Sequence, residues 1–382
     1  MKSGKIRCVN LVGGRLDVQV DSACMNLDKL CGFASRMNSK RRFLFISKVL
    51  GKHWPVRPKD MRATYQILSK AVSDVPGPII FIGMAETATG LSQGIYDSFQ
   101  SITNRVDALY IHTTRYHASH EVAFEFKEPH SHATDHLLHI PEGEFEKQVF
   151  ECANSVIIVD DEISTGNTIA NLLTEYISRN KHVKHARIVS LTNWLSMKGI
   201  SDFKNKFPEI DTDFIQLLHG SFEFTASKHF EITANKDVTG GTDNKDQYFP
   251  NNWGRFGIIG IPDIDFDKLL SESNVGSSDK VLVLGTGEFS YPPFLFAEFL
   301  EQKGIDVQFQ STTRSPIMKG CDIADKIEFV DNYGDGIANF IYNVGNNMYS
   351  KVLICYEHTI MPHDHQVIDI PNSQQLYFRR LK

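Results

Sequence analysis

The sequence has no excess of positive charge. Its 382 residues include 40 Lys and Arg against 46 Asp and Glu, which leaves a formal net charge of -6 at pH 7. Proteins that bind nucleic acid without regard to its sequence carry a strongly basic surface, which this composition does not favour. The charge balance therefore argues against nucleic acid as a partner.

Long apolar runs are missing and cysteines are few. No stretch reaches 18 apolar residues, and the N-terminal MKSGKIRCVNLVGG is interrupted by glycine and charges. These absences argue against a signal peptide and a membrane partner. The six cysteines show neither C-x-x-C spacing nor a dense disulfide pattern: Cys8, Cys24, Cys31, Cys152, Cys321 and Cys355. We expect a soluble protein in the reducing cytoplasm.

What the sequence does contain is an alternation of short apolar runs with helix-compatible segments. One such segment, residues 168–179, separates two of the runs. The runs lie at residues 79–83, 108–112, 156–159 and 187–191. This alternation predicts βαβ units, a parallel sheet and the α/β fold class.

The chain is long enough for two domains, each with its own core. Periodicity fades between residues 219 and 252, where the sequence is polar and rich in glycine. A second α/β unit is expected after it, with strands at 280–284, 306–310 and 351–359 and a helix at 292–304. The predicted boundaries are 1–218 for the first domain, 219–252 for a linker or excursion, and 253–382 for the second domain.

The most informative stretch is SVIIVDDEISTGNT, residues 155–168. Asp160 and Asp161 follow a buried strand, at the end where ligands of parallel sheets bind. The polar loop that leads into the next helix offers hydroxyl and backbone N–H groups to an anion, from Ser164, Thr165, Gly166, Asn167 and Thr168. Two carboxylates beside such a loop suit a sugar phosphate. The alternative is an ordinary strand end followed by a turn and a helix cap. A nucleotidase would need a G-x-x-x-x-G-K-[ST] loop, which the sequence lacks.

The whole pattern, four apolar residues, D-D, two further residues and S-T-G-x-T, resembles the phosphoribosyl-diphosphate (PRPP) motif of type I phosphoribosyltransferases. That resemblance implies a Rossmann-like parallel sheet with a flexible hood. It also implies transfer of phosphoribose from PRPP to a nitrogenous base, with Mg²⁺ and release of pyrophosphate. Asp160 and Asp161 would hold the ribose hydroxyls and contact Mg²⁺ with PRPP, and residues 164–168 would hold the 5-phosphate. A PRPP-sensing regulator without turnover remains the alternative.

The same resemblance assigns two further parts. GMAETATG, residues 83–90, would be the pyrophosphate loop, with Ala85, Glu86 and Thr87 in a tight turn; a plain strand-to-helix loop is the alternative. Residues 116–139 would form the hood, and Arg115 would assist catalysis beside the leaving pyrophosphate.

The hood segment is rich in histidine. Its six histidines are His117, His120, His130, His132, His136 and His139. His132 and His136 have the i, i+4 spacing of a helical zinc pair, so metal binding, donation to pyrophosphate and a merely solvated loop all stay open.

Residues 33–58 concentrate basic side chains among apolar ones, a pattern typical of the exposed face of an amphipathic helix. Together with TTR, EPHSHA and TTRSP, the segment resembles orotate-phosphoribosyltransferase-like proteins with a C-terminal TRSP domain, from bacterial tellurium-resistance-type stress operons. The resemblance implies synthesis of a nucleoside-like metabolite. A homodimer and other proteins of the stress operon are the expected partners.

The second domain offers a ligand site of its own. Gly285 and Gly287 follow one predicted strand, and Thr313, Arg314 and Ser315 follow another. Ends of parallel strands meet at one edge of a sheet, and a guanidinium among hydroxyls suits phosphate or carboxylate. We expect a separate anionic site anchored by Arg314, although the glycines also suit a simple tight turn.

Overall fold

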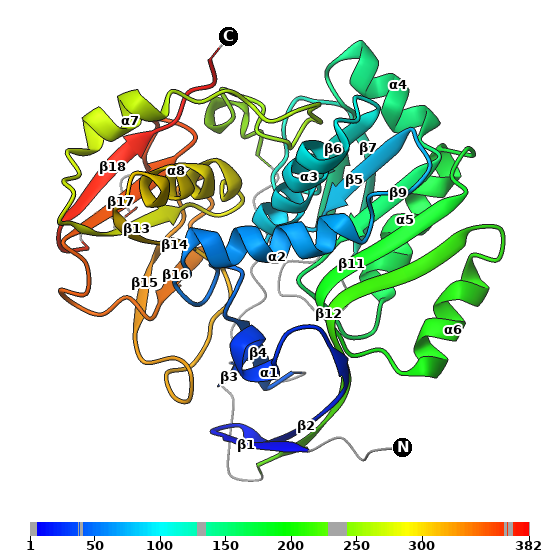
Figure 1. Cartoon of the computed structure of the whole chain (residues 1–382), viewed down its shortest axis with the longest axis horizontal. Helices are drawn as coiled ribbons and strands as arrows, with labels where there is room; N and C mark the ends of the chain where they lie inside the picture. The colour runs from blue at the N-terminus through cyan, green and yellow to red at the C-terminus, as the bar shows by residue number, and fades with distance from the viewer. Residues whose placement is uncertain are drawn as a thin grey trace.

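Two sheets built mainly of parallel strands organise the chain, with helices between and around them (Figure 1). The computed structural model describes residues 6–36, 38, 41–127, 135–227, 243–362, 365 and 370–381. The α/β class is confirmed. Within the described residues, no helix combines the length and the apolar character needed to cross a membrane.

The larger sheet contains the four strands predicted for the first domain. Its parallel strands, in spatial order, are β12 (Asp211–Ala226), β11 (His185–Asn193), β9 (Ser155–Val159), β5 (Ile79–Gly83) and β6 (Ala108–His112). The edge beside β12 continues antiparallel through β2 (Gly14–Ala23) and β1 (Arg7–Leu11), and the short β10 (Glu162–Ile163) pairs with β11. Every residue of β5, β6 and β9 is buried, which explains their continuous apolar sequences.

Helices cover both faces of this sheet. Two of them, α2 (Pro58–Lys70) and α3 (Thr89–Thr103), share an apolar core with one face. The other face packs against α4 (Glu144–Cys152), α5 (Asn167–Arg179) and α6 (Met197–Lys206). The helix predicted at 168–179 is confirmed. The expected linker at 219–252 overlaps the end of β12, so the first domain's sheet extends further than the fading periodicity indicated.

The second sheet is entirely parallel. Its strands, in spatial order, are β14 (Asp306–Ser311), β13 (Lys280–Gly285), β17 (Lys351–Tyr356) and β18 (Ser373–Tyr377). Two helices, α7 (Phe266–Ser273) and α8 (Tyr291–Gln302), accompany it, with the 3-10 turn η1 (Asp246–Tyr248) upstream. A hairpin of β15 (Lys326–Val330) and β16 (Ala338–Tyr342) lies between β14 and β17 in sequence. The strands and the helix predicted here are confirmed.

The basic segment near the N-terminus forms a hairpin. After the short α1 (Leu27–Leu30), β3 (Cys31–Ser35) pairs antiparallel with β4 (Phe43–Ser47). The expectation of an amphipathic helix is wrong, because the aromatic residues of β4 alternate and pack on neighbouring strands. Phe45, for example, stacks on Trp194 with ring centroids 4.4 Å apart.

The two domains share a continuous interface. In Figure 1, α2 lies across the molecule between the two sheets, beside α3 and α8. The guanidinium of Arg62 on α2 joins these helices, because it pairs with Asp97 on α3 and Glu298 on α8, both at 2.7 Å. Residues of both sheets belong to one apolar cluster. The domains therefore fold against one another over a buried surface.

Candidate active site

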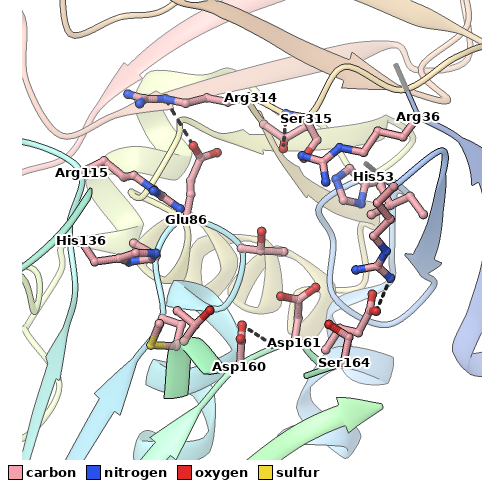
Figure 2. Close-up of a pocket in the computed structure, with 18 of the residues that line it drawn as sticks. Arg36, His53, Glu86, Arg115, His136, Asp160, Asp161, Ser164, Arg314 and Ser315 are labelled. Atoms are coloured by element: carbon pink, nitrogen blue, oxygen red, sulfur yellow. Dashed lines mark hydrogen bonds and ion pairs between the residues drawn. The ribbon is translucent and has the colours of Figure 1, made fainter. Parts of the chain in front are cut away.

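A cavity of about 300 Å³ opens where β5 and β9 end (Figure 2). Gly83 lies beside Val159, and Val159 beside Val189, so the loops after these strands leave the sheet at the same level. The chain runs from β5 to β6 on one side and returns to β9 on the other. This is the switch point of a parallel sheet, where a gap between diverging loops admits a ligand.

Asp160 and Asp161 lie at the mouth of that gap, as predicted from the sequence. The backbone N–H of Asp160 donates to the carbonyl of Val189 at 3.0 Å. The backbone N–H of Asp161 donates to Oδ1 of Asp160 at 2.9 Å. Burial, and then the neighbouring carboxylate of Glu162, raises the pKa of Asp161 to about 6. The strand end thus presents a concentration of negative charge to the cavity.

The polar loop after these acids forms the next part of the wall. Ser164, Thr165, Gly166 and Thr168 line the cavity, whereas Asn167 does not. Gly166 has φ +71°, a conformation that costs other residues energy, and the backbone turns there into α5. The first N–H groups of α5 lack helical partners, so this end of the helix attracts anions.

The loop after β5 lies beside the acids. The N–H of Met84 donates to the carbonyl of Val159 at 2.9 Å, and that of Ala85 donates to Oγ1 of Thr113 at 2.9 Å. Ala85, Glu86 and Thr87 all line the cavity, as the predicted pyrophosphate loop requires, and the peptide bond between the first two is cis. These contacts join the loop to β9 and to the residue that follows β6.

The carboxylate of Glu86 lies between two cations. Oε1 is 3.2 Å from Nζ of Lys52, and Oε2 is 3.5 Å from Nε of Arg314. Burial lowers the pKa of Lys52, although the neighbouring Glu86 opposes that change. Figure 2 shows the Glu86 and Arg314 side chains pointing toward one another across the upper part of the site.

Arg115 also lines the cavity, and its backbone N–H donates to Oε1 of Glu288 in the second domain at 2.9 Å. Of the described histidines in the expected hood, His136 alone reaches the cavity. Its Nδ1 is 3.1 Å from Oγ1 of Thr113. The hood is expected at 116–139, and the hairpin of β7 (Val122–Lys127) and β8 (Asp135–His139) lies in it.

The zinc hypothesis gains no support from this geometry. His136 lies in β8, so the expected helical spacing from His132 does not apply. His130 and His132 themselves lie outside the described residues. Among the residues that the structure describes, no group of three or more His, Cys, Asp or Glu side chains is arranged to hold a metal ion.

The second domain contributes to the same cavity. Thr313, Arg314 and Ser315 line it together with Asp160 and Asp161. The expected separate site is therefore a wall of the first one, because the loop after β14 faces the larger sheet. A hydroxyl of the first domain holds Arg314 there: Nη2 donates to the phenol oxygen of Tyr116 at 2.6 Å.

The two glycines predicted for that site lie elsewhere. Neither Gly285 nor Gly287 lines the cavity. Gly285 is the last residue of β13, and the carbonyl of Gly287 accepts a hydrogen bond from Nζ of Lys52 at 2.9 Å. The two glycines lie in a tight turn, which was the alternative interpretation of the sequence.

Several wall residues were not singled out as site residues from the sequence. Among them are Arg36, Arg41, Leu44 and His53 from the N-terminal segment, Glu162 beside the acids, and Ile337, Ala338 and Phe340 from the second domain. Glu162 forms an ion pair with Arg41. The basic content of residues 33–58 was the one available signal for the arginines, whereas His53 and Phe340 carry no local pattern that marks them.

Two family models match the chain. A family model described as phosphoribosyl transferase matches residues 30–221, about half of the chain. A second, described as the TRSP domain that lies C-terminal to this transferase, matches residues 254–370. No curated protein matches the chain.

Among solved structures, adenine phosphoribosyl transferase from Trypanosoma brucei, in complex with AMP, pyrophosphate and ribose-5-phosphate, is similar at 11% identity and a TM-score of 0.37. The match covers 55% of this chain and 86% of that one. For the enzyme from Leishmania donovani the values are 14%, 0.34, 50% and 77%. For the enzyme from Giardia lamblia with 9-deazaadenine they are 12%, 0.32, 49% and 94%. On the match of its family model, the chain belongs to the phosphoribosyl transferases, enzymes of pentosyl transfer, and carries a TRSP domain after the transferase domain.

Proposed function

We propose that the cavity transfers phosphoribose from PRPP to a nitrogenous base and releases pyrophosphate. The observation that carries this proposal is the convergence of three segments on one space of about 300 Å³. These segments are the acids Asp160 and Asp161, the loop 164–168 at the start of α5, and the loop 85–87 after β5. Acceptors for hydroxyls and donors for phosphates thus lie within reach of a single small molecule.

Each segment has a chemical role in this proposal. Asp160 and Asp161 accept hydrogen bonds from the ribose hydroxyls, and N–H groups of the loop into α5 bind the 5-phosphate. Arg115 and Arg314 lie near the loop 85–87, where they balance the charge of the departing pyrophosphate. The transition state is oxocarbenium-like, so the residues act by positioning, charge neutralisation and exclusion of water.

The donor set also suits Mg²⁺, which prefers one or two carboxylates together with substrate phosphates. Asp160 and Asp161, adjacent at the cavity, would hold the ion with PRPP oxygens. Bound there, it supplies positive charge to the phosphates. The carboxylates serve as ligands or as acceptors for the ribose hydroxyls, and both roles require that they be ionised.

A PRPP sensor without turnover is the second candidate. The observation that favours it is Glu86, whose carboxylate is joined to Lys52 and Arg314. Cations already paired within the protein give less stabilisation to a departing pyrophosphate, which would slow turnover more than binding. On the sequence resemblance alone, we also propose that the transferase is encoded in a stress operon and helps to make a nucleoside-like metabolite.

The deciding experiment measures pyrophosphate release from PRPP, Mg²⁺ and a panel of bases, with mass detection of any nucleotide formed. In the double variant Asp160→Asn, Asp161→Asn we expect kcat/KM to fall at least about a hundredfold, since each charge-assisted hydrogen bond contributes roughly 1.5 to 3 kcal/mol. Asp202→Asn on exposed α6 is the matched control. PRPP binding without release supports the sensor, and no PRPP binding by the wild type contradicts both functions.

A further inference from the structure

One wall of the cavity is built partly by the second domain. Its chemistry differs from that of the acidic end of β9. Figure 2 shows Asp160 and Asp161 on one side of the site and His53 and Ser315 on another. Leu44 of β4 and Ala338 and Phe340 of β16 also line the cavity. These three belong to one apolar cluster that both domains supply. We call Leu44, His53, Ala338 and Phe340 the acceptor wall.

His53 is the polar member of this wall, and it is only 5% exposed. Its Nε2 is buried and has no hydrogen-bond partner among the residues that the structure describes. A buried polar atom without a partner is unfavourable, and such atoms in native proteins usually meet a ligand or water. Burial lowers the pKa of His53 to about 3, so the imidazole is neutral and Nε2 either donates or accepts one hydrogen bond.

The wall is held in place by hydrogen bonds between the domains. The N–H of Met318 donates to the carbonyl of Ser35 at 2.9 Å, and that of Ser311 donates to the carbonyl of Gly51 at 2.7 Å. Nδ2 of Asn343 donates to the carbonyl of His53 itself at 3.2 Å. The N-terminal hairpin and the second domain are therefore fixed to one another on both sides of His53, and the wall is formed before a ligand arrives.

Phe340 is fixed in the same way. Its N–H donates to the carbonyl of Thr313 at 2.7 Å, and its carbonyl accepts from the N–H of Thr313 at 3.1 Å. This pairing ties the TRSP tetrapeptide to β16, so the ring of Phe340 and the loop that carries Arg314 keep a constant relation. An apolar surface bordered by polar groups, here His53 with Arg36 and Ser315, suits a flat ring that has polar atoms in its plane.

Resting on the proposed function, we propose that the acceptor wall binds the acceptor of phosphoribose, and that this acceptor is a heteroaromatic base. The ring packs on Leu44 and Phe340, and a ring nitrogen or an exocyclic group meets Nε2 of His53. Ammonia and aliphatic amines have no flat apolar surface that could pack against this wall. The TRSP domain then takes part in selecting the acceptor through Ala338 and Phe340, beside Leu44 and His53 of the first domain.

The test separates the two halves of the cavity by calorimetry. PRPP is titrated first into the wild type. Ribose 5-phosphate and pyrophosphate then saturate the PRPP half without reaction, and adenine, hypoxanthine, uracil, cytosine, orotate, nicotinate and ethanolamine are titrated in turn. We expect at least one heteroaromatic base to bind and ethanolamine not to bind.

Two variant pairs locate the base. His53→Leu removes the polar atom, and we expect it to weaken base binding about tenfold or more, whereas His53→Gln retains an amide near Nε2 and restores most of the affinity. We expect Phe340→Leu to weaken base binding as well. Phe329→Leu is its control, because Phe329 lies on the partner strand β15, is similarly buried and does not line the cavity. PRPP affinity should be unchanged in all four variants.

The outcomes distinguish this inference from the function on which it rests. If the wild type binds PRPP but no heteroaromatic base, or binds only ethanolamine, the acceptor class is wrong and the PRPP site stands. If His53→Leu and Phe340→Leu bind base as the wild type does, the acceptor wall is wrong. A wild type that does not bind PRPP overturns the proposed function itself. If Phe340→Leu does not fold, by circular dichroism, the His53 pair decides alone.

Discussion

Two parallel-sheet switch points lie within the described residues, and they differ in what occupies them. Between β5 and β9 the loops leave a cavity, whereas between β13 and β17 the corresponding space is filled by Arg255 from the segment that precedes the second sheet. The guanidinium of Arg255 pairs with Glu288 after β13 at 3.1 Å and with Glu357 after β17 at 3.2 Å. All three side chains are at most 2% exposed.

The comparison separates the contribution of sheet topology from the contribution of the side chains. A switch point provides diverging loops in both sheets, but a ligand enters only where the chain leaves the space empty. In the second sheet the chain supplies its own cation, and Tyr333 completes the cluster by donating to Glu357 at 2.6 Å. This is the physical reason why the glycine turn after β13 forms no ligand site there.

The largest expected effect comes from breaking the filled switch point. Arg255→Met leaves two buried carboxylates without their cation, and we expect the free energy of unfolding to fall by about 3 to 5 kcal/mol. Urea denaturation measures it. Adding Glu288→Gln and Glu357→Gln should recover part of the loss. A change below about 1 kcal/mol would mean that water already reaches the cluster.

The next effect concerns Arg314 at the open switch point. Arg314→Ala removes a cation from the cavity, so PRPP should bind roughly ten- to a hundredfold more weakly, as expected for a charged hydrogen-bonding group. Arg380→Ala, an exposed position of the same domain, is the control. Calorimetry with PRPP compares the affinity of each variant with that of the wild type. Equal affinities would restore the hypothesis of a separate site in the second domain.

A third prediction uses the raised pKa of Asp161. Its folded pKa of about 6 lies above the ordinary value near 4, so the folded state holds the proton more tightly. Its contribution to stability is present at low pH and is lost as pH rises through that window. Asp161→Asn should therefore be more stable than the wild type at pH 7.5, by about 1 to 2 kcal/mol, and equal to it near pH 4.

Urea denaturation at the two pH values tests this, with Asp202→Asn as the control. A variant that is less stable than the wild type at pH 7.5 would show that the Asp161 carboxylate is satisfied in the folded state. In the filled switch point, the pKa of a buried carboxyl group shifts in the opposite direction. There, burial alone would raise the pKa of Glu288, but Arg255 lowers it.

The smallest effect compares one glycine from each switch point. Gly166 has φ +71° and Gly287 has φ +57°, so alanine at either position costs about 1 kcal/mol of stability. Only Gly166→Ala should raise KM for PRPP, because Gly287 does not line the cavity. Steady-state kinetics beside urea denaturation measures both. A raised KM in Gly287→Ala alone would reverse the assignment of the two switch points.

The sequence predicted the parts of the molecule that local pattern encodes. The apolar runs of β5, β6, β9 and β11 were recognisable because strands buried on both faces have no polar side, and the acids after β9 followed directly. The hairpin of β3 and β4 was mistaken because charge density says nothing about pairing. The two strands pair across a short turn, but the packing of Phe45 against Trp194 lies outside any local window.

The remaining parts depend on contacts between distant segments. Nothing near Arg255 in the sequence marks it as the residue that fills a sheet edge, since both carboxylates lie after later strands. His53 and Phe340 become neighbours of the cavity only when the two domains pack. The same packing places Arg314, which was predicted to anchor a separate site, in the wall of the cavity beside the larger sheet.

The hydrogen bond from Asn343 to the carbonyl of His53 joins residues 290 positions apart. During translation the N-terminal hairpin leaves the ribosome long before the strands that fix it, because domains emerge in chain order. A nascent chain that has made only the transferase domain thus lacks the second-domain residues that line the cavity, such as Arg314 and Phe340, and the cavity stays open to water. Completion of synthesis is therefore a condition for an enclosed cavity.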